Sequence, residues 1–340
     1  MADPEIQDPI AELITNYNEL NSSVIEELDE EPSALEFMRF VARNTPFVVR
    51  GAAADWQATR TWTVDYLKDV LGDEPVNVAV TPRGNADAPT PYTSPDGTTT
   101  TLVFAKPHEE DQPFSAFLSH LTSTPQKEVR YAQTQNDNLR HGEYHPLFHH
   151  VPPTIPWARL ALGQEQPDAV NLWIGNARSV TALHKDNYEN VYVQVAGHKH
   201  FVLLPPAGGA AAVVNEQPLS AARYVRTHTL EGEEEGLEGG LELVLDDGEE
   251  GKGEVVPFAI WDPNRPAENA TRYSALAQPM RVTLDPGDML YLPCMWYHKV
   301  SQSCSPEGVC IAVNYWYDMD FAGPLYPLST FVRSVVNKET

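Results

Sequence analysis

The feature that most limits the fold of this chain is a series of short apolar strand patterns in its second half. Four of them follow one another between Asn171 and Pro206, with turn residues between them. Further strand patterns occupy Arg281–Pro293, Trp296–Ser303 and Val309–Asp318. No clear helical pattern separates these strands, and closely spaced short strands of this kind are typical of a jelly-roll. We therefore predict a mainly β protein.

The rest of the chain predicts a mixed α/β cap before the jelly-roll and a helix after it. Ser33, with Glu36 three residues later, indicates a capping box at the start of a helix. Helical spacing of apolar residues covers Ile10–Leu20, Ala34–Arg43, Trp62–Leu71, Phe114–Leu121 and Tyr326–Asn337. Strand patterns cover Pro46–Gly51, Val76–Thr81 and Val129–Gln133. We predict a helical region at 1–45, the jelly-roll with its flanking elements at 46–320, and a C-terminal helix at 321–340.

The net charge of −25 is concentrated in two segments. Residues 1–34 contain ten acidic residues and no lysine or arginine, and residues 231–254 contain eleven acidic residues and one lysine. The second segment also contains seven glycines and buries little, so we predict a flexible acidic insertion. Such a surface disfavours nucleic acid as a partner and favours a basic protein, although solvated acidic loops explain it equally simply.

The sequence also limits where the protein works. No apolar run approaches the roughly 18 residues needed to cross a bilayer, so no membrane span is expected. The acidic N-terminus lacks the pattern of a secretory signal. The three cysteines, Cys294, Cys304 and Cys310, are too few and too close together for a disulfide framework or a zinc finger. We expect a reducing compartment, either the cytoplasm or the nucleus.

One His-x-Asp pair stands out as a candidate metal site. His184 and Asp186 lie in a strand pattern, where positions i and i+2 point to the same face and can reach one ion. His298 follows another apolar strand and would add a third ligand. Two histidines and one carboxylate form the facial triad of non-haem Fe(II) oxygenases. For His184 alone, a hydrogen-bonded core histidine is an equally good interpretation.

An oxygenase of this type needs a carboxylate-bearing co-substrate, and the chain offers a cation for it. Lys199 stands on the strand after His184 and just ahead of an apolar run, where an unpaired buried lysine would be costly. Thr181 would add a hydroxyl donor, and Tyr131 and Asn190 would add further polar contacts. The alternative is a lysine whose stem covers apolar surface while its charge reaches solvent.

Two other groups of residues have simpler interpretations. The segment His141–His150 holds four histidines, but its Pro, Gly and aromatic content predicts a loop within His141–Pro156 rather than a second metal site. Four aromatic residues near the ligand strands are expected in the core, with one or two of them lining a substrate channel: Trp173, Tyr188, Trp296 and Trp316.

Several motifs together resemble the JmjC (jumonji-C) 2-oxoglutarate oxygenases. They are TALHKDNYENVYVQVAGHKHFVLLPP, PGDMLYLPCMWYHKV and IAVNYWYDM, and the likeness extends to RGAAADW, YLKDVLG, VNVAVTPRGNAD and VRYAQTQNDNL. It covers nearly the whole chain apart from the first residues and the insertion 231–254, which touches no motif residue. Within the family, the chain is most similar to the branch of small lysyl hydroxylases.

The resemblance implies a double-stranded β-helix of the cupin-like type and a complete set of site residues. His184, Asp186 and His298 would hold Fe(II). The family places a threonine three residues before the first iron histidine, an asparagine six after it and a lysine fifteen after it, which gives Thr181, Asn190 and Lys199. Lys199, Thr181 and Tyr131 would anchor 2-oxoglutarate, with Asn190 and Asn314 close by. Dioxygen would take the remaining position on iron.

The branch resemblance implies lysyl C-3 hydroxylation of a partner protein, with small GTPases of the developmentally regulated type as the implied target. Three alternatives remain open at this stage. One is N-methyl-lysine or N-methyl-arginine demethylation, although the chain contains no recognisable methyl-lysine reader. Another is a non-catalytic cupin-like binding module, and a third is hydroxylation of a tRNA base. The family and the segment PLYPLSTFVRSVV also suggest a homodimer formed through the C-terminal segment.

Overall fold

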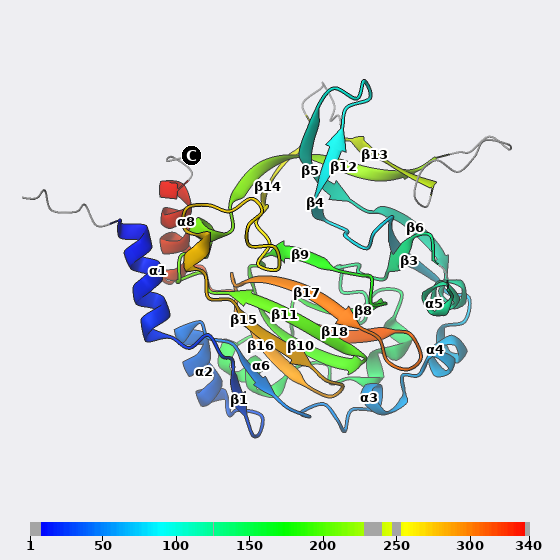
Figure 1. The fold of residues 1–340 in the computed structure, drawn as a ribbon. Coiled ribbons are helices and arrows are strands. Elements are labelled where there is room, and N and C mark those ends of the chain that lie inside the picture. The colour runs from blue at the N-terminus through cyan, green and yellow to red at the C-terminus, as the bar shows by residue number, and fades with distance from the viewer. Residues whose placement is uncertain (1–7, 125, 228–239, 247–252, 337–340) are drawn as a thin grey trace, which may run out of the picture.

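The core of the protein is formed by two β-sheets that face one another (Figure 1). The computed structural model describes residues 8–124, 126–227, 240–246 and 253–336. The larger sheet has six strands in the order β1-β2-β16-β10-β18-β8. Their bounds are β1 Glu26–Leu28, β2 Phe47–Val49, β8 Ala169–Gly175, β10 Tyr188–Ala196, β16 Met289–Leu292 and β18 Cys310–Asp318.

The smaller sheet has four strands in the order β15-β11-β17-β9. Their bounds are β9 Thr181–His184, β11 His198–Leu204, β15 Met280–Leu284 and β17 Tyr297–Ser303. All ladders within this sheet are antiparallel, and along β8–β11 and again along β15–β18 consecutive strands alternate between the two sheets. This is the arrangement of a double-stranded β-helix, so the predicted fold class is confirmed.

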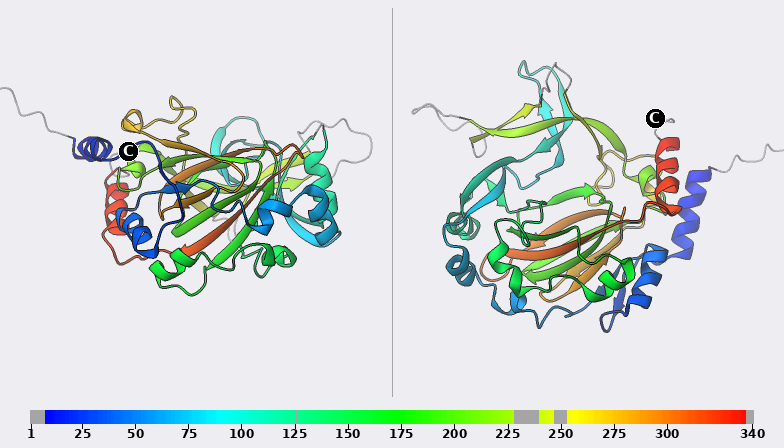
Figure 2. Two further views of the ribbon diagram at one scale, coloured as in Figure 1. Left: turned by 90° about the horizontal axis from the view of Figure 1, so that it is seen from below. Right: turned by 180° about the vertical axis from the view of Figure 1, so that it is seen from behind.

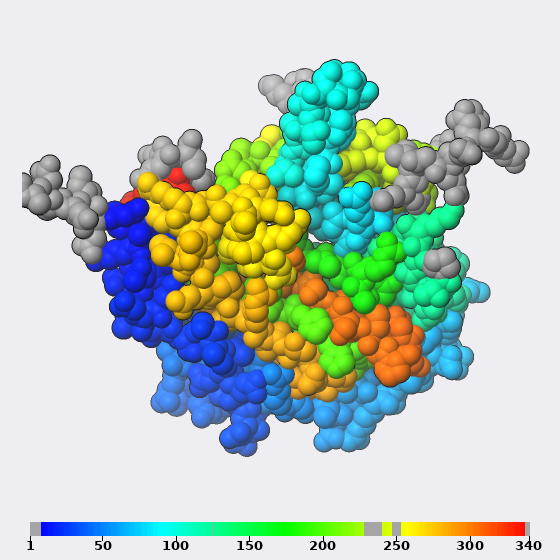
Figure 3. Space-filling model, viewed as in Figure 1, coloured from blue at the N-terminus to red at the C-terminus, as the bar shows by residue number. Residues whose placement is uncertain are grey.

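Two further sheets flank the double-stranded β-helix. One has the order β13-β12-β5-β4 with β14 also paired to β12, and the other has the order β6-β3-β7. In the first, the bounds are β4 Ala88–Thr93, β5 Thr100–Lys106, β12 Glu216–Arg226, β13 Leu241–Leu245 and β14 Val255–Ala259. In the second, they are β3 Pro75–Thr81, β6 His108–Pro113 and β7 Val129–Tyr131. The hairpin of β4 and β5 projects from the body of the molecule (Figure 3).

Helices cover the outer side of the larger sheet and one end of the molecule (Figure 2). The helix α2 begins with the predicted capping box, in which the Ser33 side chain accepts from the Glu36 amide and the Glu36 carboxylate accepts from the Ser33 amide. The bounds are α1 Pro9–Leu20, α2 Ala34–Arg43, α3 Gln57–Thr61, α4 Val64–Leu71, α5 Phe114–Thr122, α6 Pro156–Leu162, α7 Ala210–Val213 and α8 Leu325–Val336, with 3-10 turns at His145–His150 and Ser274–Leu276.

Apart from the exposed edge strand β1, the strands of the larger sheet are buried on both faces because each face packs against a different core. On the outer side, Val191 and Val313 pack among residues of the helices, such as Phe37 and Trp157. On the inner side, alternate residues of the same strands pack between the two sheets with side chains of the smaller sheet, as Phe201 does. Nearly continuous apolar runs, as in β10, are what burial on both faces requires.

The first third of the chain contains more strand than the sequence predicted. The strands β4 and β6 were not expected, because two of the six residues of β4 are prolines and β6 is polar. The strand β5 was also not predicted, although it contains the apolar run Leu102–Ala105. The helix expected at Trp62–Leu71 begins at Val64, and a separate short helix, α3, precedes it. The predicted His141–Pro156 loop contains the 3-10 turn His145–His150. The C-terminal helix α8 agrees with the expected Tyr326–Asn337, although Asn337 lies outside the described residues.

The prediction of an unstructured acidic insertion at 231–254 is wrong for its middle part. Residues 241–245 form β13, which pairs antiparallel with β12, and Leu241 is buried in the core beside Tyr224. The alternation of leucine with glutamate and valine in LELVL carries this strand, but the surrounding acidic and glycine residues concealed it. Residues 228–239 and 247–252 lie outside the described part of the chain.

Cys294, Cys304 and Cys310 are all free thiols, and Cys294 and Cys310 are buried. Within the described residues, no helix is long and apolar enough to cross a membrane.

Candidate metal centre and its cavity

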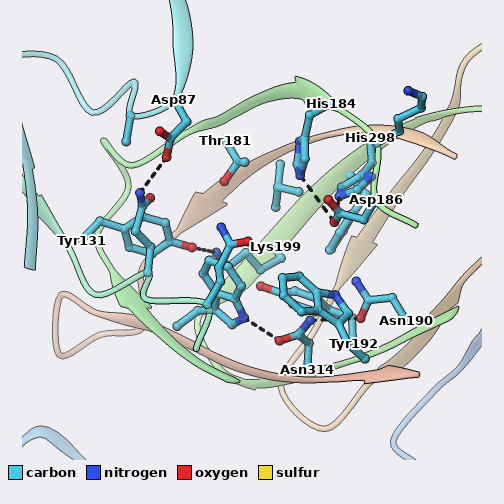
Figure 4. Close-up of a pocket in the computed structure, with 18 of the residues that line it drawn as sticks. Asp87, Tyr131, Thr181, His184, Asp186, Asn190, Tyr192, Lys199, His298 and Asn314 are labelled. Atoms are coloured by element: carbon cyan, nitrogen blue, oxygen red, sulfur yellow. Dashed lines mark hydrogen bonds and ion pairs between the residues drawn. The ribbon is translucent and has the colours of Figure 1, made fainter. Parts of the chain in front are cut away.

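Three potential metal ligands converge at one end of the smaller sheet. His184 is the last residue of β9, Asp186 follows it by two residues, and His298 lies on β17. The Nε2 atoms of His184 and His298 lie 3.7 Å and 3.6 Å from Oδ2 of Asp186. Among the described residues, these three form the one group of His, Cys, Asp and Glu side chains whose ligand atoms lie within 4.8 Å of one another. The close-up in Figure 4 shows them facing the same cavity.

The backbone brings Asp186 into place in a way that differs from the prediction. We expected His184 and Asp186 on one face of a strand, but β9 ends at His184 and Asp186 lies in the segment that leads into β10. The carbonyl oxygen of Asp186 accepts a hydrogen bond of 2.7 Å from the Met295 amide, just before β17. The ladder between β9 and β17 pairs His184 with His298 directly. Asp186 is therefore positioned by contact with the segment that delivers the third ligand.

Backbone carbonyls orient both imidazole rings. The Nδ1 atom of His184 lies 2.9 Å from the Ala182 carbonyl oxygen, and that of His298 lies 3.0 Å from the Trp296 carbonyl oxygen. A neutral imidazole donates from Nδ1 in this arrangement, which leaves the Nε2 lone pair directed at the centre of the site. The same pattern, a carbonyl two residues upstream, recurs in both histidines.

Charge and burial set the protonation of the three residues. Burial lowers the pKa of His298 to about 4, and the nearby His184 contributes in the same direction. Burial alone would raise the pKa of Asp186, but the His184 and His298 imidazoles hold it at about 2. Burial opposes protonation of His184 as well, yet its interaction with Asp186 raises its pKa above the usual value. At neutral pH the site therefore presents an ionised carboxylate and a neutral His298.

At the other end of the cavity, Lys199 is buried, with 2% of its surface exposed. Its Nζ donates a hydrogen bond of 3.0 Å to the Tyr131 hydroxyl (Figure 4). No carboxylate of the described residues forms an ion pair with it. This geometry excludes the alternative of a lysine whose charge reaches solvent. A buried ammonium without a counter-charge is costly, so the cavity favours an anionic ligand at this point.

The remaining predicted residues line the same cavity. The Asn314 amide donates a hydrogen bond of 3.2 Å to the Asn190 side chain and accepts one of 2.9 Å from the Trp173 indole. Thr181, on β9, presents its side chain between the metal ligands and Tyr131 (Figure 4). All eight residues singled out from the sequence therefore surround one cavity of about 280 Å³.

Several residues of the cavity were not found from the sequence. Tyr192 lies two positions after Asn190 on β10, so the period of two of a strand is the signal that could have identified it. Asp87 lies in the turn before β4, Phe104 on β5 and Phe258 on β14. These segments carried no strand prediction, and nothing in the sequence placed them near the metal ligands.

The two other groups of interest also have clear positions. In the histidine-rich segment, His150 accepts a hydrogen bond of 2.8 Å from the Trp62 indole and lies 2.9 Å from the Gln57 amide nitrogen, which is a structural role. Of the four aromatic residues, Trp173 and Trp316 line the cavity. Trp296 is buried in the core, and Tyr188 stacks on Trp316 with ring centres 4.8 Å apart.

The chain is similar to known proteins over most of its length. Residues 32–323 match the family described as Cupin-like domain. The human protein named Bifunctional peptidase and (3S)-lysyl hydroxylase JMJD7 is 38% identical over 298 residues, which cover 86% of this chain and 84% of that protein. Lysine-specific demethylase JMJ32 of Arabidopsis thaliana is 35% identical, covering 93% and 88% of the two chains. JmjC domain-containing protein E of Dictyostelium discoideum is 32% identical, covering 91% and 92%.

These likenesses agree with the geometry of the site. The matched region includes both sheets of the double-stranded β-helix and all three residues of the triad His184, Asp186 and His298. The fold, the triad and the relatives together show that this chain belongs to the JmjC family, the cupin-like Fe(II)- and 2-oxoglutarate-dependent oxygenases.

Proposed function

We propose that this protein is a lysyl hydroxylase that acts on carbon C-3 of a lysine in a partner protein, a small GTPase of the developmentally regulated type. The observation that carries the proposal is the 38% identity, over 86% of the chain, to a protein named as a (3S)-lysyl hydroxylase. The metal triad and the cavity beside it supply the chemistry that such a reaction needs.

The donor set of the triad fits Fe(II). Two imidazole nitrogens and one carboxylate oxygen would hold the ion through Nε2 of His184, Oδ2 of Asp186 and Nε2 of His298. Such a set occupies one face of an octahedron and leaves three positions open. A non-catalytic binding module has no need of this set, which argues against that alternative.

The buried cation fits 2-oxoglutarate. The Lys199 ammonium and the Tyr131 hydroxyl would receive the distal carboxylate, with the Thr181 hydroxyl as a further donor. Asn190 and Asn314 would add polar contacts closer to the metal. Together, Fe(II), 2-oxoglutarate and dioxygen supply the oxidant that replaces a C–H bond of the substrate with C–OH.

The chain's own residues prepare the site for this chemistry. The carbonyls of Ala182 and Trp296 fix the rings of the two histidines, so that little reorganisation is needed when the metal binds. The apolar faces of Trp173 and Phe201 wall the cavity and restrict water near the reacting carbon. Asp87 and Lys185 also line the cavity and supply charged groups that a side chain of the partner protein would meet.

A second candidate is demethylation of an N-methyl-lysine, because a relative of 35% identity is named as a lysine-specific demethylase. Both reactions use the same metal site, and they differ in the carbon that is presented to it. Hydroxylation of a side-chain carbon gives a stable product that is heavier by one oxygen atom. Hydroxylation of an N-methyl group gives a hemiaminal, which releases formaldehyde and leaves the lysine without that methyl group.

Mass spectrometry separates the two candidates. We expect the protein, supplied with Fe(II), 2-oxoglutarate and ascorbate, to add one oxygen to an unmodified lysine of the GTPase without stoichiometric formaldehyde. A substrate whose lysine carries deuterium at C-3 should lose one deuterium. The His298→Ala variant serves as the control for non-enzymatic oxidation. Stoichiometric formaldehyde from a methylated peptide, with no oxygen retained on unmethylated lysine, would establish the demethylase instead.

A further inference from the structure

The cavity contains one carboxylate that the metal site does not use. Of the residues that line it within the described chain, only Asp87 and Asp186 are acidic, and Asp186 belongs to the triad. Figure 4 shows Asp87 at the far side of Thr181 from the metal ligands, facing the same space. A side chain that reaches the metal would therefore pass near both groups.

The position of Asp87 is held by its backbone and by one neighbour. The residue has a φ of 51°, in the left-handed region that Asp and Asn adopt more readily than most residues. Its Oδ2 accepts a hydrogen bond of 3.0 Å from the Gln133 amide. Gln133 follows Tyr131 by two residues, so the segment that meets Lys199 also orients Asp87. Among the described residues, this is the carboxylate's one hydrogen bond and no ion pair involves it.

Aromatic side chains line the same cavity as this carboxylate. Phe104 on β5 and Phe258 on β14 line the cavity, and their ring centres lie 5.0 Å apart. A carboxylate next to aromatic surface matches a lysine side chain, which has an apolar methylene stem and a charged tip. Burial raises the pKa of Asp87 above its usual value, and a bound cation would offset that cost.

We propose that Asp87 receives the ε-ammonium group of the substrate lysine, while Phe104 and Phe258 flank its methylene stem. This inference rests on the proposed lysyl hydroxylase function and deepens it. The C-3 atom and the ammonium are four bonds apart, so one end of the lysine reaches the metal while the other meets Asp87. Charge recognition at this distance from the reacting carbon selects lysine over neutral side chains of the same length.

Paired peptides test the inference. The first is a peptide centred on a lysine of a developmentally regulated GTPase, and the second has norleucine in its place, which keeps the stem and removes the ammonium. Each is assayed for oxygen incorporation and for binding to the metal-loaded protein. We expect the wild-type protein to prefer the lysine peptide, and Asp87→Asn to weaken its binding by about tenfold to a hundredfold, the loss expected for a charged hydrogen bond.

Asparagine suits the backbone at this position and keeps the size of the side chain, so the variant tests charge rather than folding. Glu109→Gln is the matched control, because Glu109 is an exposed acid on β6 and does not line the cavity. We expect this control to keep both the wild-type preference for lysine and the wild-type turnover. A Phe258→Leu variant should weaken binding of the lysine and norleucine peptides equally.

The outcomes are distinguishable. The inference is wrong if the Asp87→Asn variant keeps the full preference for the lysine peptide over the norleucine peptide. It is also wrong if the variant binds both peptides more weakly by the same factor. The proposed function stands in either case. If the wild-type protein adds no oxygen to lysine in any substrate, the proposed function fails and the inference fails with it.

Discussion

The imidazole rings of His184 and His298 lie with their centres 4.1 Å apart, because the ladder between β9 and β17 pairs these two residues directly. The two histidines come from strands far apart in the sequence, yet register within one sheet places them together. Asp186 completes the site from outside the sheet, so its position depends on the loop after β9 and not on strand register.

Removing either ligand of the His-x-Asp pair should abolish activity without unfolding the protein. We expect His184→Ala and Asp186→Ala to lose stoichiometric iron binding and the decarboxylation of 2-oxoglutarate, because two remaining ligands hold the ion poorly. Iron content and 2-oxoglutarate consumption are the measurements. His141→Ala is the control, since this exposed histidine of the histidine-rich segment lies outside the site. Wild-type turnover in either ligand variant would contradict the assignment.

Lys199→Ala should act mainly on the co-substrate. Loss of a charged hydrogen bond of roughly 1.5–3 kcal/mol should raise the KM for 2-oxoglutarate by about tenfold to a hundredfold. Tyr131→Phe, which removes only the hydroxyl that accepts from Lys199, should have a smaller effect in the same direction. Steady-state kinetics with varied 2-oxoglutarate and a parallel measurement of iron binding test both variants. An unchanged KM in Lys199→Ala would mean that another cation binds the distal carboxylate.

Because β13 lies within the acidic insertion, deleting the insertion should affect the stability of the protein. Removing 231–254 takes away β13 together with buried Leu241, so we expect loss of stability rather than a neutral effect. Leu241→Ala alone should lower the free energy of unfolding by roughly 2–5 kcal/mol. Val244 lies on the same strand but is 38% exposed, so Val244→Ala should lower the free energy of unfolding much less. Urea denaturation of the two variants measures these changes. If both variants lose the same free energy of unfolding, burial of Leu241 does not stabilise the fold.

Variants of residues 228–239 test separately whether negative charge attracts a basic partner protein. If this acidic segment attracts a basic partner, neutralising its glutamates should weaken substrate binding and flatten the dependence of binding on salt, while β13 remains intact. Substrate affinity at low and high salt is the measurement. Unchanged affinity at low salt would exclude recruitment of the partner by the charge of this segment.

A buried ion pair should make stability depend on pH. Burial alone would raise the pKa of Glu128, but Arg226 and Arg130 lower it below its usual 4.5. This group therefore stabilises the fold above pH 4.5, and its contribution is lost as the pH falls through the folded-state value. At neutral pH, Glu128→Gln should lower the free energy of unfolding by about 1–2 kcal/mol. The effect is modest because the Arg226 side chain is partly exposed to solvent. A difference between variant and wild type that does not shrink on acidification would contradict this.

The C-terminal segment should form a homodimer. Phe321, Tyr326, Leu328 and Phe331 are all exposed there, and Phe331 is 63% exposed. We expect light scattering to give twice the chain mass for the wild-type protein and the monomer mass for Phe331→Asp. Leu160→Asp, at an equally exposed leucine of α6, is the control and should leave the dimer intact. A monomeric wild-type protein at high concentration would exclude this interface.

The sequence predicted the fold best where the chain repeats its strand pattern. Apolar residues bounded by turn residues identified β8, β10, β11, β17 and β18, and most residues of each of these strands are buried. The strands β4, β5 and β6 left no such signal, since their side chains are polar or partly exposed. Their pairing depends on contacts with distant segments such as β12 and β3.

The site residues likewise differ in whether a local sequence pattern reveals them. His184, Asp186 and His298 occupy spacings that a metal site requires, and Lys199 was conspicuous as a charge beside an apolar run. Asp87 is a single acid in a polar turn, and its place in the cavity follows from the packing of the flanking sheet. Local patterns reveal residues that neighbour one another along a strand, whereas residues brought in by tertiary packing carry no local signature.

The central position of β10 between β16 and β18 has a consequence for biosynthesis. The strand that follows Asp186 has no hydrogen-bonded neighbour in the larger sheet until residues 289–318 have been made. His298 belongs to that same late stretch. A chain still growing on the ribosome therefore carries only two of the three iron ligands, while β9 and β10 on either side of Asp186 still lack their partner strands. Metal acquisition must come after nearly the whole polypeptide has been synthesised, so prematurely terminated chains should emerge without iron.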